Sequence, residues 1–207
     1  MGIFLMIFLV VHLGINSLLL FDPTRELFNE VAHFMGTNLI IQAMQWVLFA
    51  AFVFHIILGI VLQIQNMIAR PKGYKVKASS EDSFFSKYMI HTGIIIFVFL
   101  IIHFANFFIK AKIFHGAPEF ILNGIPTGIE DMGILVMELF KFPGYVIGYI
   151  IALLVLGFHL DHAFQSAFQS LGINHKKYTP FIKGFGHLYS IIITIGYILI
   201  PLFIYFT

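Results

Sequence analysis

Residues 38–68 read NLIIQAMQWVLFAAFVFHIILGIVLQIQNMI, and His55 is their only ionisable side chain. A helix needs about 20 mostly apolar residues to cross about 30 Å of hydrocarbon. This stretch exceeds that length and lacks the strict alternation of a membrane β-strand. It therefore predicts a transmembrane helix that is tilted or that extends beyond the bilayer.

Four other stretches have the same character, namely Gly2–Phe21 and, approximately, residues 84–109, 142–171 and 180–206. Only 11% of the chain is charged, whereas soluble domains carry about 25%. The first stretch has neither a preceding basic region nor a cleavage site, so we expect a span and not a signal peptide. The sequence predicts an all-α, integral membrane bundle of five transmembrane helices in a single domain, residues 1–207.

The charged residues divide between the two sets of loops. The loops after the second and fourth spans carry basic residues: Arg70, Lys72, Lys75, Lys77, Lys87, Lys176, Lys177 and Lys183. The other loops carry Asp22, Glu26, Glu30, Glu119, Glu130, Asp131 and Glu138. The positive-inside rule then predicts a cytoplasmic N-terminus and a C-terminus on the outer side. The chain has no cysteine, which excludes disulfides and iron–sulfur ligation by this chain, and no basic stripe indicates nucleic acid.

Four of the ten histidines lie deep inside the spans, where an ionisable group is costly unless it has a function. Counting 1.5 Å per residue from the outer helix ends places His12 and His103 at a depth of about 14 Å. The same count places His55 and His159 at about 25 Å. The four histidines therefore form two predicted pairs, about 10 Å apart before helix tilt is considered.

Two levels of paired imidazoles suit two bis-histidine haems enclosed by the helices, with apolar walls around each porphyrin. Glycines would let a macrocycle approach a helix, and the nearby ones are Gly14, Gly59, Gly93 and Gly157. The simpler alternative is that each histidine forms a hydrogen bond between helices. Another alternative is a transporter in which the histidines relay protons without haem.

Two further histidines are weaker candidates for cofactor binding. His91 is expected near a cytoplasmic helix end, where the two roles considered are a contact with a haem propionate and a position at the membrane interface. His162 follows His159 by one helical turn. Spacing alone leaves open whether His162 supports the ligand or is the ligand.

Several short motifs occur in order along the chain: a Gly-x-Phe-Leu run that leads to His12, Phe54-His55 with Gly59, Thr92-Gly93 before His103, and His159 before Leu171-Gly172. With these motifs the whole chain resembles the di-haem cytochrome b subunit of succinate:quinone oxidoreductases. These subunits are the five-helix membrane anchors of succinate dehydrogenases and fumarate reductases.

The resemblance implies axial ligands His55 and His159 for an inner haem b and His12 and His103 for an outer one. It selects His159 over His162. It also implies a bacterial inner membrane, a flavoprotein subunit with FAD, an iron–sulfur subunit on the cytoplasmic face, and a membrane quinone, expected to be menaquinone. The dicarboxylate chemistry belongs to the partners, and a dimer of the whole complex is allowed. A di-haem anchor of a hydrogenase or formate dehydrogenase is the alternative family function.

The sequence also supports predictions for Glu30, Asp161 and Gly157. Glu30, beside His33, is the candidate group for quinone chemistry near the outer pair. The alternative is a solvated helix start with Asn29 and Asn38 in capping roles.

Asp161 is the only acid deep in a span, and we expect it to form an ion pair with a neighbouring helix. His162 and water are the other partners considered. Gly157 stands where some proton-translocating relatives carry Glu, which argues against a proton path there.

Overall fold

The computed structural model describes residues 1–69, 82–173, 175 and 177–207, and the side chains of residues 82–87 lie outside this description. In chain order the elements are α1 (Gly2–Phe21), α2 (Glu26–Thr37), α3 (Leu39–Ala69), α4 (Asp82–His103), the π-helix η1 (Phe104–Ile109), α5 (Lys110–Lys112), β1 (Glu119–Leu122), β2 (Ile125–Glu130), α6 (Met132–Phe140), α7 (Pro143–Ser170) and α8 (Thr179–Phe206).

The five predicted spans are confirmed as helices that are long and apolar enough to cross a membrane. They are α1, α3, the continuous run Tyr88–Lys112, α7 and α8. Their ends follow local chemistry, because α7 and α8 both carry proline in the first turn, where a missing N–H costs no helical hydrogen bond. Gly172 then stops α7 with a φ of +77°, the left-handed conformation that glycine adopts readily. The chain is thus a multi-pass, helical membrane protein.

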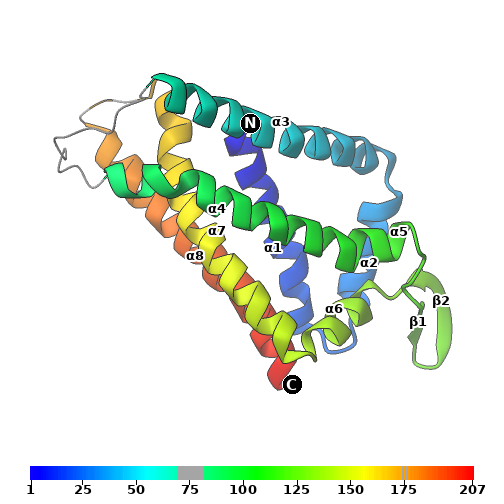
Figure 1. The fold of residues 1–207 in the computed structure, drawn as a ribbon. Coiled ribbons are helices and arrows are strands. Elements are labelled where there is room, and N and C mark those ends of the chain that lie inside the picture. Colours follow the sequence, from blue (N-terminus) through cyan, green and yellow to red (C-terminus); the bar gives the residue numbers. More distant parts are fainter. Residues whose placement is uncertain (70–81, 174, 176) are drawn as a thin grey trace.

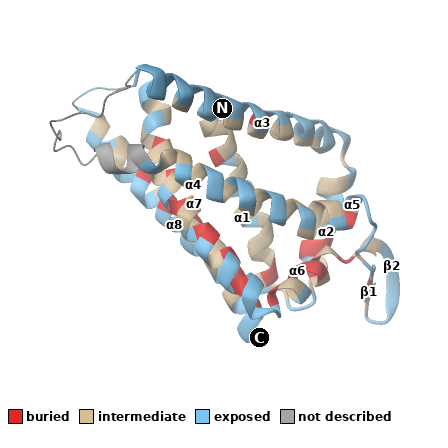
Figure 2. Cartoon of the chain, in the orientation of Figure 1, coloured by how far each residue is buried: buried red, intermediate tan, exposed pale blue. Residues whose placement is uncertain are grey.

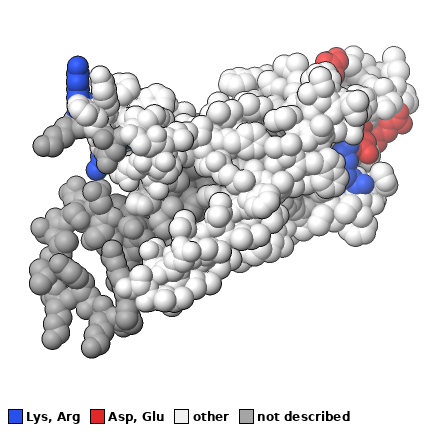
Figure 3. All heavy atoms as spheres, turned by 90° about the horizontal axis from the view of Figure 1, so that it is seen from above, with Lys and Arg blue, Asp and Glu red and all other residues white. Residues whose placement is uncertain are grey.

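The connecting segments gather at two opposite ends of the bundle (Figure 1). The end of α3, the start of α4 and the turn between α7 and α8 lie at one end, while α2, the β1–β2 hairpin and α6 lie at the other. Figure 3 shows acidic side chains at the second end and an uncharged band in the middle of the visible face. We call the end with α2, the hairpin and α6 the acidic end. Of the predicted basic residues, Arg70, Lys72, Lys75, Lys77 and Lys176 and the side chain of Lys87 lie outside the description.

The acidic end contains more structure than the loop pattern predicted. Residues 119–130 form an antiparallel hairpin in which Leu122 pairs with Ile125 and Glu119 with Glu130. Asn123 and Gly124 turn the chain with positive φ angles of 52° and 80°, which suits a two-residue hairpin turn. Helix α6 follows this hairpin in the sequence, and α2 contacts both β2 and α6, so the outer connections form a small cap and not plain loops.

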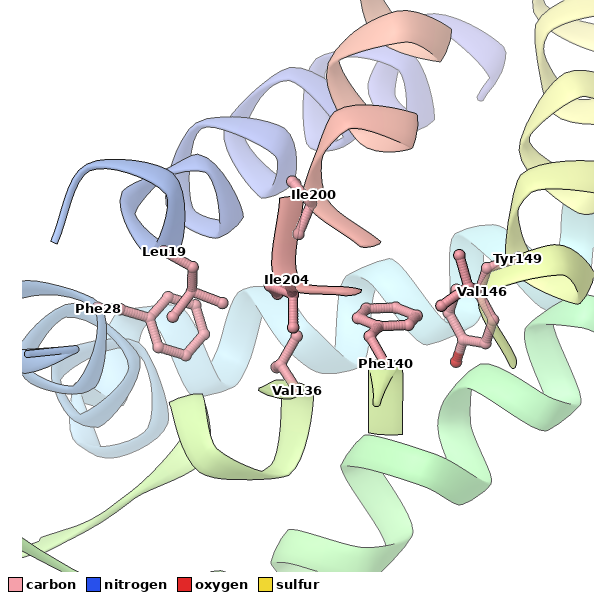
Figure 4. Packing of buried hydrophobic residues seen from close by; sticks show 8 residues of the cluster. All are labelled: Leu19, Phe28, Val136, Phe140, Val146, Tyr149, Ile200 and Ile204. Carbon is pink, nitrogen blue, oxygen red and sulfur yellow. The ribbon is translucent and has the colours of Figure 1, made fainter. Parts of the chain in front are cut away.

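Two apolar clusters hold the bundle together. One lies at the acidic end, where side chains from α1, α2, α6, α7 and α8 converge (Figure 4): Leu19, Phe28, Val136, Phe140, Val146, Tyr149, Ile200 and Ile204. The other lies nearer the opposite end, between α1, α7 and α8, and contains Met6, Leu160, Phe164 and Ile193. Figure 2 shows that buried positions concentrate on α7 and α8, whereas α3 and α4 are mostly exposed. The close-packed part of the fold is therefore α1, α7 and α8.

Within the cap, a buried polar cluster at Asp131 joins α2 to α6. Its carboxylate accepts hydrogen bonds from Arg25 (Nη2, 2.8 Å; Nε, 3.3 Å), from Asn29 Nδ2 (2.9 Å) and from the N–H of Ile134 (2.9 Å). Asn29 is completely buried and accepts from the N–H of Gly133 at 2.9 Å. Burial raises the pKa of Asp131, but these hydrogen bonds and the Arg25 charge outweigh it and lower the pKa below its ordinary value.

Of the two asparagines predicted to cap helices, one does so and the other does not. A capping role for Asn29 is wrong, because its amide joins α2 to α6 through side-chain and backbone bonds far along the chain. The capping role of Asn38 is confirmed, since its Oδ1 accepts from the N–H groups of Ile40 and Ile41 at 3.0 and 3.2 Å. The two residues differ because the partners of Asn38 are two and three residues away, whereas the partners of Asn29 lie at the start of α6.

Gly157 permits the closest approach of α7 to α8. A Cβ placed there would overlap the hydroxyl of Thr194 on α8. Gly157→Ala is therefore expected to destabilise the detergent-solubilised protein by about 1–3 kcal/mol through overpacking, measured by thermal or SDS-induced unfolding. Gly148→Ala on the same helix is the matched control, because no described atom lies within 4 Å of its Cβ; it should be neutral or stabilising. Equal effects of the two substitutions would contradict the packing assigned to Gly157.

Candidate functional site

The structure brings His12 of α1 beside His103 of α4. Their ring centres lie 5.9 Å apart with nearly perpendicular planes, at 86°. Aromatic rings surround the pair: Phe8 stacks on His12 at 5.2 Å, and Phe99, Phe107 and Tyr149 lie between 5.1 and 6.3 Å from His103. The pair therefore sits in an apolar, aromatic setting between two helices that are distant in the sequence.

The second pair consists of His55 of α3 and His159 of α7. Their ring centres lie 6.2 Å apart at an interplanar angle of 81°. The Nδ1 atom of His159 lies 3.2 Å from the hydroxyl of Thr92 on α4. A Cβ placed on the adjacent Gly93 would be 3.9 Å from His159 Cε1. Thus three helices meet at this pair, and α4 contributes the two small residues of its Thr92-Gly93 motif.

Both separations match the geometry of two imidazoles on one iron. Metal–imidazole bonds are about 2.0–2.1 Å long and a ring nitrogen lies about 1 Å from the ring centre, so two axial rings have centres about 6 Å apart. The donor chemistry also fits, because two neutral imidazoles suffice for haem. Nδ1 of His103 is buried and has no hydrogen-bond partner among the described residues. Within the same residues no group of three or more His, Asp or Glu could hold a metal ion, and tetrahedral zinc sites need that many.

The two pairs lie at different levels of the bundle. On α7, Tyr149 contacts the His103 ring at 6.3 Å, whereas His159, further along the same helix, belongs to the other pair. The spacing of about 10 Å between the levels stays a prediction.

A π-helix begins directly after His103, at Phe104, and continues to Ile109. Such wide turns are rare and occur often at functional sites. This one carries Asn106, whose Nδ2 donates to the hydroxyl of Tyr149 at 3.2 Å, and Tyr149 in turn contacts His103. Sequence reasoning missed the π-helix, because residues 104–109 contain no proline or glycine to signal an irregular helix.

The weaker histidine candidates lie outside the two pairs. His91 is exposed and contacts the ring of Tyr88 at 5.7 Å. His162 is half-buried and makes no ring contact with His55 in the described part of the chain; the ring that faces His55 is that of His159. Asp161 lies against Nδ1 of His187 on α8. The prediction of a partner on a neighbouring helix is therefore confirmed for Asp161.

Glu30 lines a cavity of about 230 Å³ at the acidic end. Glu26, Glu30 and His33 form one wall, on one face of α2, and the hairpin forms the other with Phe120, Leu122, Thr127 and Ile129. Carboxylates, an imidazole and an apolar wall thus meet in one place. The cavity is somewhat smaller than the 300–1,000 Å³ typical of sites for drug-sized ligands.

The glycines near the pairs have different surroundings. Among the described residues, no side chain lies within 4 Å of a Cβ placed on Gly14 or Gly59, and Gly93 faces His159. These three positions leave room beside a histidine. Gly157 does not, because its missing side chain is explained by the contact with Thr194.

Comparison with known proteins identifies no relative of this chain. No protein-family model matches the chain, and neither curated proteins nor solved structures give a match.

Proposed function

We propose that this chain is a di-haem cytochrome b anchor that passes electrons between a membrane quinone and a partner enzyme, as a subunit of a succinate:quinone oxidoreductase. The observation that carries the proposal is the pair of imidazole separations, 5.9 and 6.2 Å, at two levels of one helix bundle. Two histidines that merely bridged helices would have no reason to repeat this spacing at a second level. The sequence motifs support the choice of family.

The residues of the chain hold, orient and shield the cofactors. His12 with His103 and His55 with His159 would supply axial nitrogens, and haem would supply reversible one-electron transfer. Thr92 hydrogen-bonds His159 and orients its ring, while Asn106 and Tyr149 support the His103 region. The aromatic rings around the outer pair exclude water and maintain a low dielectric, which influences the potential of a bound haem.

The partner subunits belong to the proposal and follow from the chemistry that this chain lacks. It has no cysteine for iron–sulfur clusters, so the clusters of such an oxidoreductase would belong to a partner. An iron–sulfur subunit and an FAD-containing flavoprotein on the cytoplasmic face of a bacterial inner membrane would complete the electron path. The inner pair, His55 and His159, would receive or deliver electrons on that side.

Quinone chemistry requires a group that exchanges protons beside an apolar slot. Glu30 satisfies this requirement at the acidic end, where its cavity joins carboxylates to apolar side chains of the hairpin. The outer pair is the nearer of the two, because Phe99 and Phe107, whose rings contact His103, pack against the same apolar cluster as Phe28 of α2. We therefore assign Glu30 as the candidate proton-exchanging residue for menaquinone.

A dithionite-reduced visible spectrum of the purified protein tests the proposal. A b-type α-band with two haems per chain is expected, and its absence would exclude haem in this protein. The accompanying subunits distinguish the family: a flavoprotein that oxidises succinate supports the proposal, and a nickel or molybdenum subunit favours the hydrogenase or formate dehydrogenase alternative. In the same preparation, Glu30→Gln should slow haem reduction by a menaquinol analogue without changing the spectrum; an unchanged rate would remove Glu30 from the quinone site.

A further inference from the structure

The hydroxyl of Thr92 makes two contacts that together define its role. It donates to the backbone oxygen of Met89 at 2.9 Å, within its own helix α4. It also lies 3.2 Å from Nδ1 of His159 on α7. A hydroxyl has one proton and two lone pairs. Because that proton is used by Met89, the oxygen of Thr92 is an acceptor toward His159.

The protonation of the imidazole follows from this arrangement. If Thr92 accepts, Nδ1 of His159 carries the hydrogen, and in a neutral ring Nε2 then keeps the free lone pair. Only a nitrogen with a free lone pair can bind a metal. The contact therefore leaves Nε2 of His159 free to bind a metal before any ligand arrives.

Among the described residues, the outer pair has no equivalent acceptor. Asn16 approaches His12, but its Nδ2 donates to the His12 backbone oxygen at 2.8 Å and lies 3.5 Å from Nδ1. An amide nitrogen donates and does not accept. Nδ1 of His103 has no partner among the described residues. The two sites thus differ in whether a hydrogen bond to Nδ1 sets the tautomer of a histidine.

We propose that Thr92 is a positioning residue that holds His159 in the Nδ1–H tautomer, so that the inner site binds haem more tightly and at a lower potential than it would without this hydroxyl. The inference rests on the proposed function. Hydrogen bonds from the second ring nitrogen raise the basicity of a ligating histidine, and their loss costs about 10–100-fold in metal affinity in other sites. A more basic ligand favours the oxidised iron, which lowers the potential.

The test compares Thr92→Val, which removes the hydroxyl at nearly constant volume, with Thr92→Ser, which keeps it. Ser17→Ala is the control, because the Ser17 hydroxyl donates to a backbone oxygen in its own helix α1, that of Leu13 at 2.8 Å. Haem titration and potentiometry report on the inner site, which is identified as the component lost in His159→Ala. Thr92→Val should lower inner-site affinity by about 10–100-fold and raise its potential, while Thr92→Ser and Ser17→Ala should match the unmodified protein.

A second measurement does not depend on haem. Nitrogen-15 NMR of the full chain prepared without haem distinguishes protonated from free ring nitrogens, and the His159 signal is the one missing in His159→Ala. We expect the Nδ1–H form in the unmodified protein and a mixture in Thr92→Val. An Nε2–H form in the unmodified protein, or unchanged affinity and potential in Thr92→Val, would overturn the inference. A chain that shows the Nδ1–H form but binds no haem would instead refute the proposed function alone.

Discussion

Replacing His159 by alanine is expected to remove one of the two haems and leave the other. The substitution deletes one ligand nitrogen of the inner pair, whereas the outer pair lies at another level and uses two other helices, α1 and α4. Haem content and the reduced α-band should both fall to about half, because each bis-histidine haem depends on its two ligands. Pyridine haemochrome assay and visible spectroscopy of the purified protein measure this loss.

Two further substitutions control for this result. His162→Ala, one turn along the same helix, should retain both haems, because the ring that faces His55 is that of His159. His12→Ala should remove the other component, since His12 pairs with His103. Loss of haem in His162→Ala with retention in His159→Ala would show that the ligand assignment on α7 is wrong.

Asp131→Ala is expected to produce the largest loss of stability. It leaves the partly buried guanidinium of Arg25 and the fully buried amide of Asn29 without their acceptor, and it removes the N-cap of α6. Leaving a buried polar group unsatisfied costs about 1–3 kcal/mol, and losing an N-cap costs about 0.5–2 kcal/mol, so a total loss of about 2–5 kcal/mol is expected. Unfolding of the detergent-solubilised protein by heat or SDS measures the loss. Glu138→Ala is the control, because Glu138 is an exposed acid on the same helix, and a similar loss in both variants would contradict the role of Asp131.

The same carboxylate predicts a pH dependence of stability. Burial raises the pKa of Asp131, and the bonds from Arg25, Asn29 and Ile134 lower it by more, so the folded pKa lies below the ordinary 3.8. The unfolded chain then binds the proton more readily than the folded one, and stability rises with pH in this window. The contribution is fully present above the unfolded value and is lost as pH falls through the folded pKa. Asp131→Asn should abolish this acid-dependent part of the unfolding curve.

The spans could be predicted because a membrane imposes a strong and local rule. Twenty or so apolar residues with no charge identify a spanning helix regardless of its neighbours, and all five appear where expected. The pairing of His12 with His103 and of His55 with His159 could be predicted for a related reason. Rise per residue is constant in a helix, so position in the sequence reports depth.

The cap at the acidic end could not be predicted, because its stability is not local. The elements within residues 26–37 and 119–140 are short and mix polar with apolar residues. Asn29 looks like a capping residue until its partner Asp131, distant in the sequence, is placed beside it. The cavity at Glu30 has the same origin, since α2 supplies one wall and the hairpin the other. Hydrogen bonds between distant segments leave no periodic signature in either segment.

By itself, the sequence determined that this protein has five helices long and apolar enough to cross a membrane, and it predicted that four histidines in them form two pairs. Hydrophobicity and helical rise are properties of single segments, so they can be read without knowing the fold. Only the tertiary structure decided which faces of the helices meet. It placed Thr92 against Nδ1 of His159, Thr194 against Gly157 and the π-helix after His103. Rotation about a helix axis determines such contacts, and that rotation results from the packing of all five helices together.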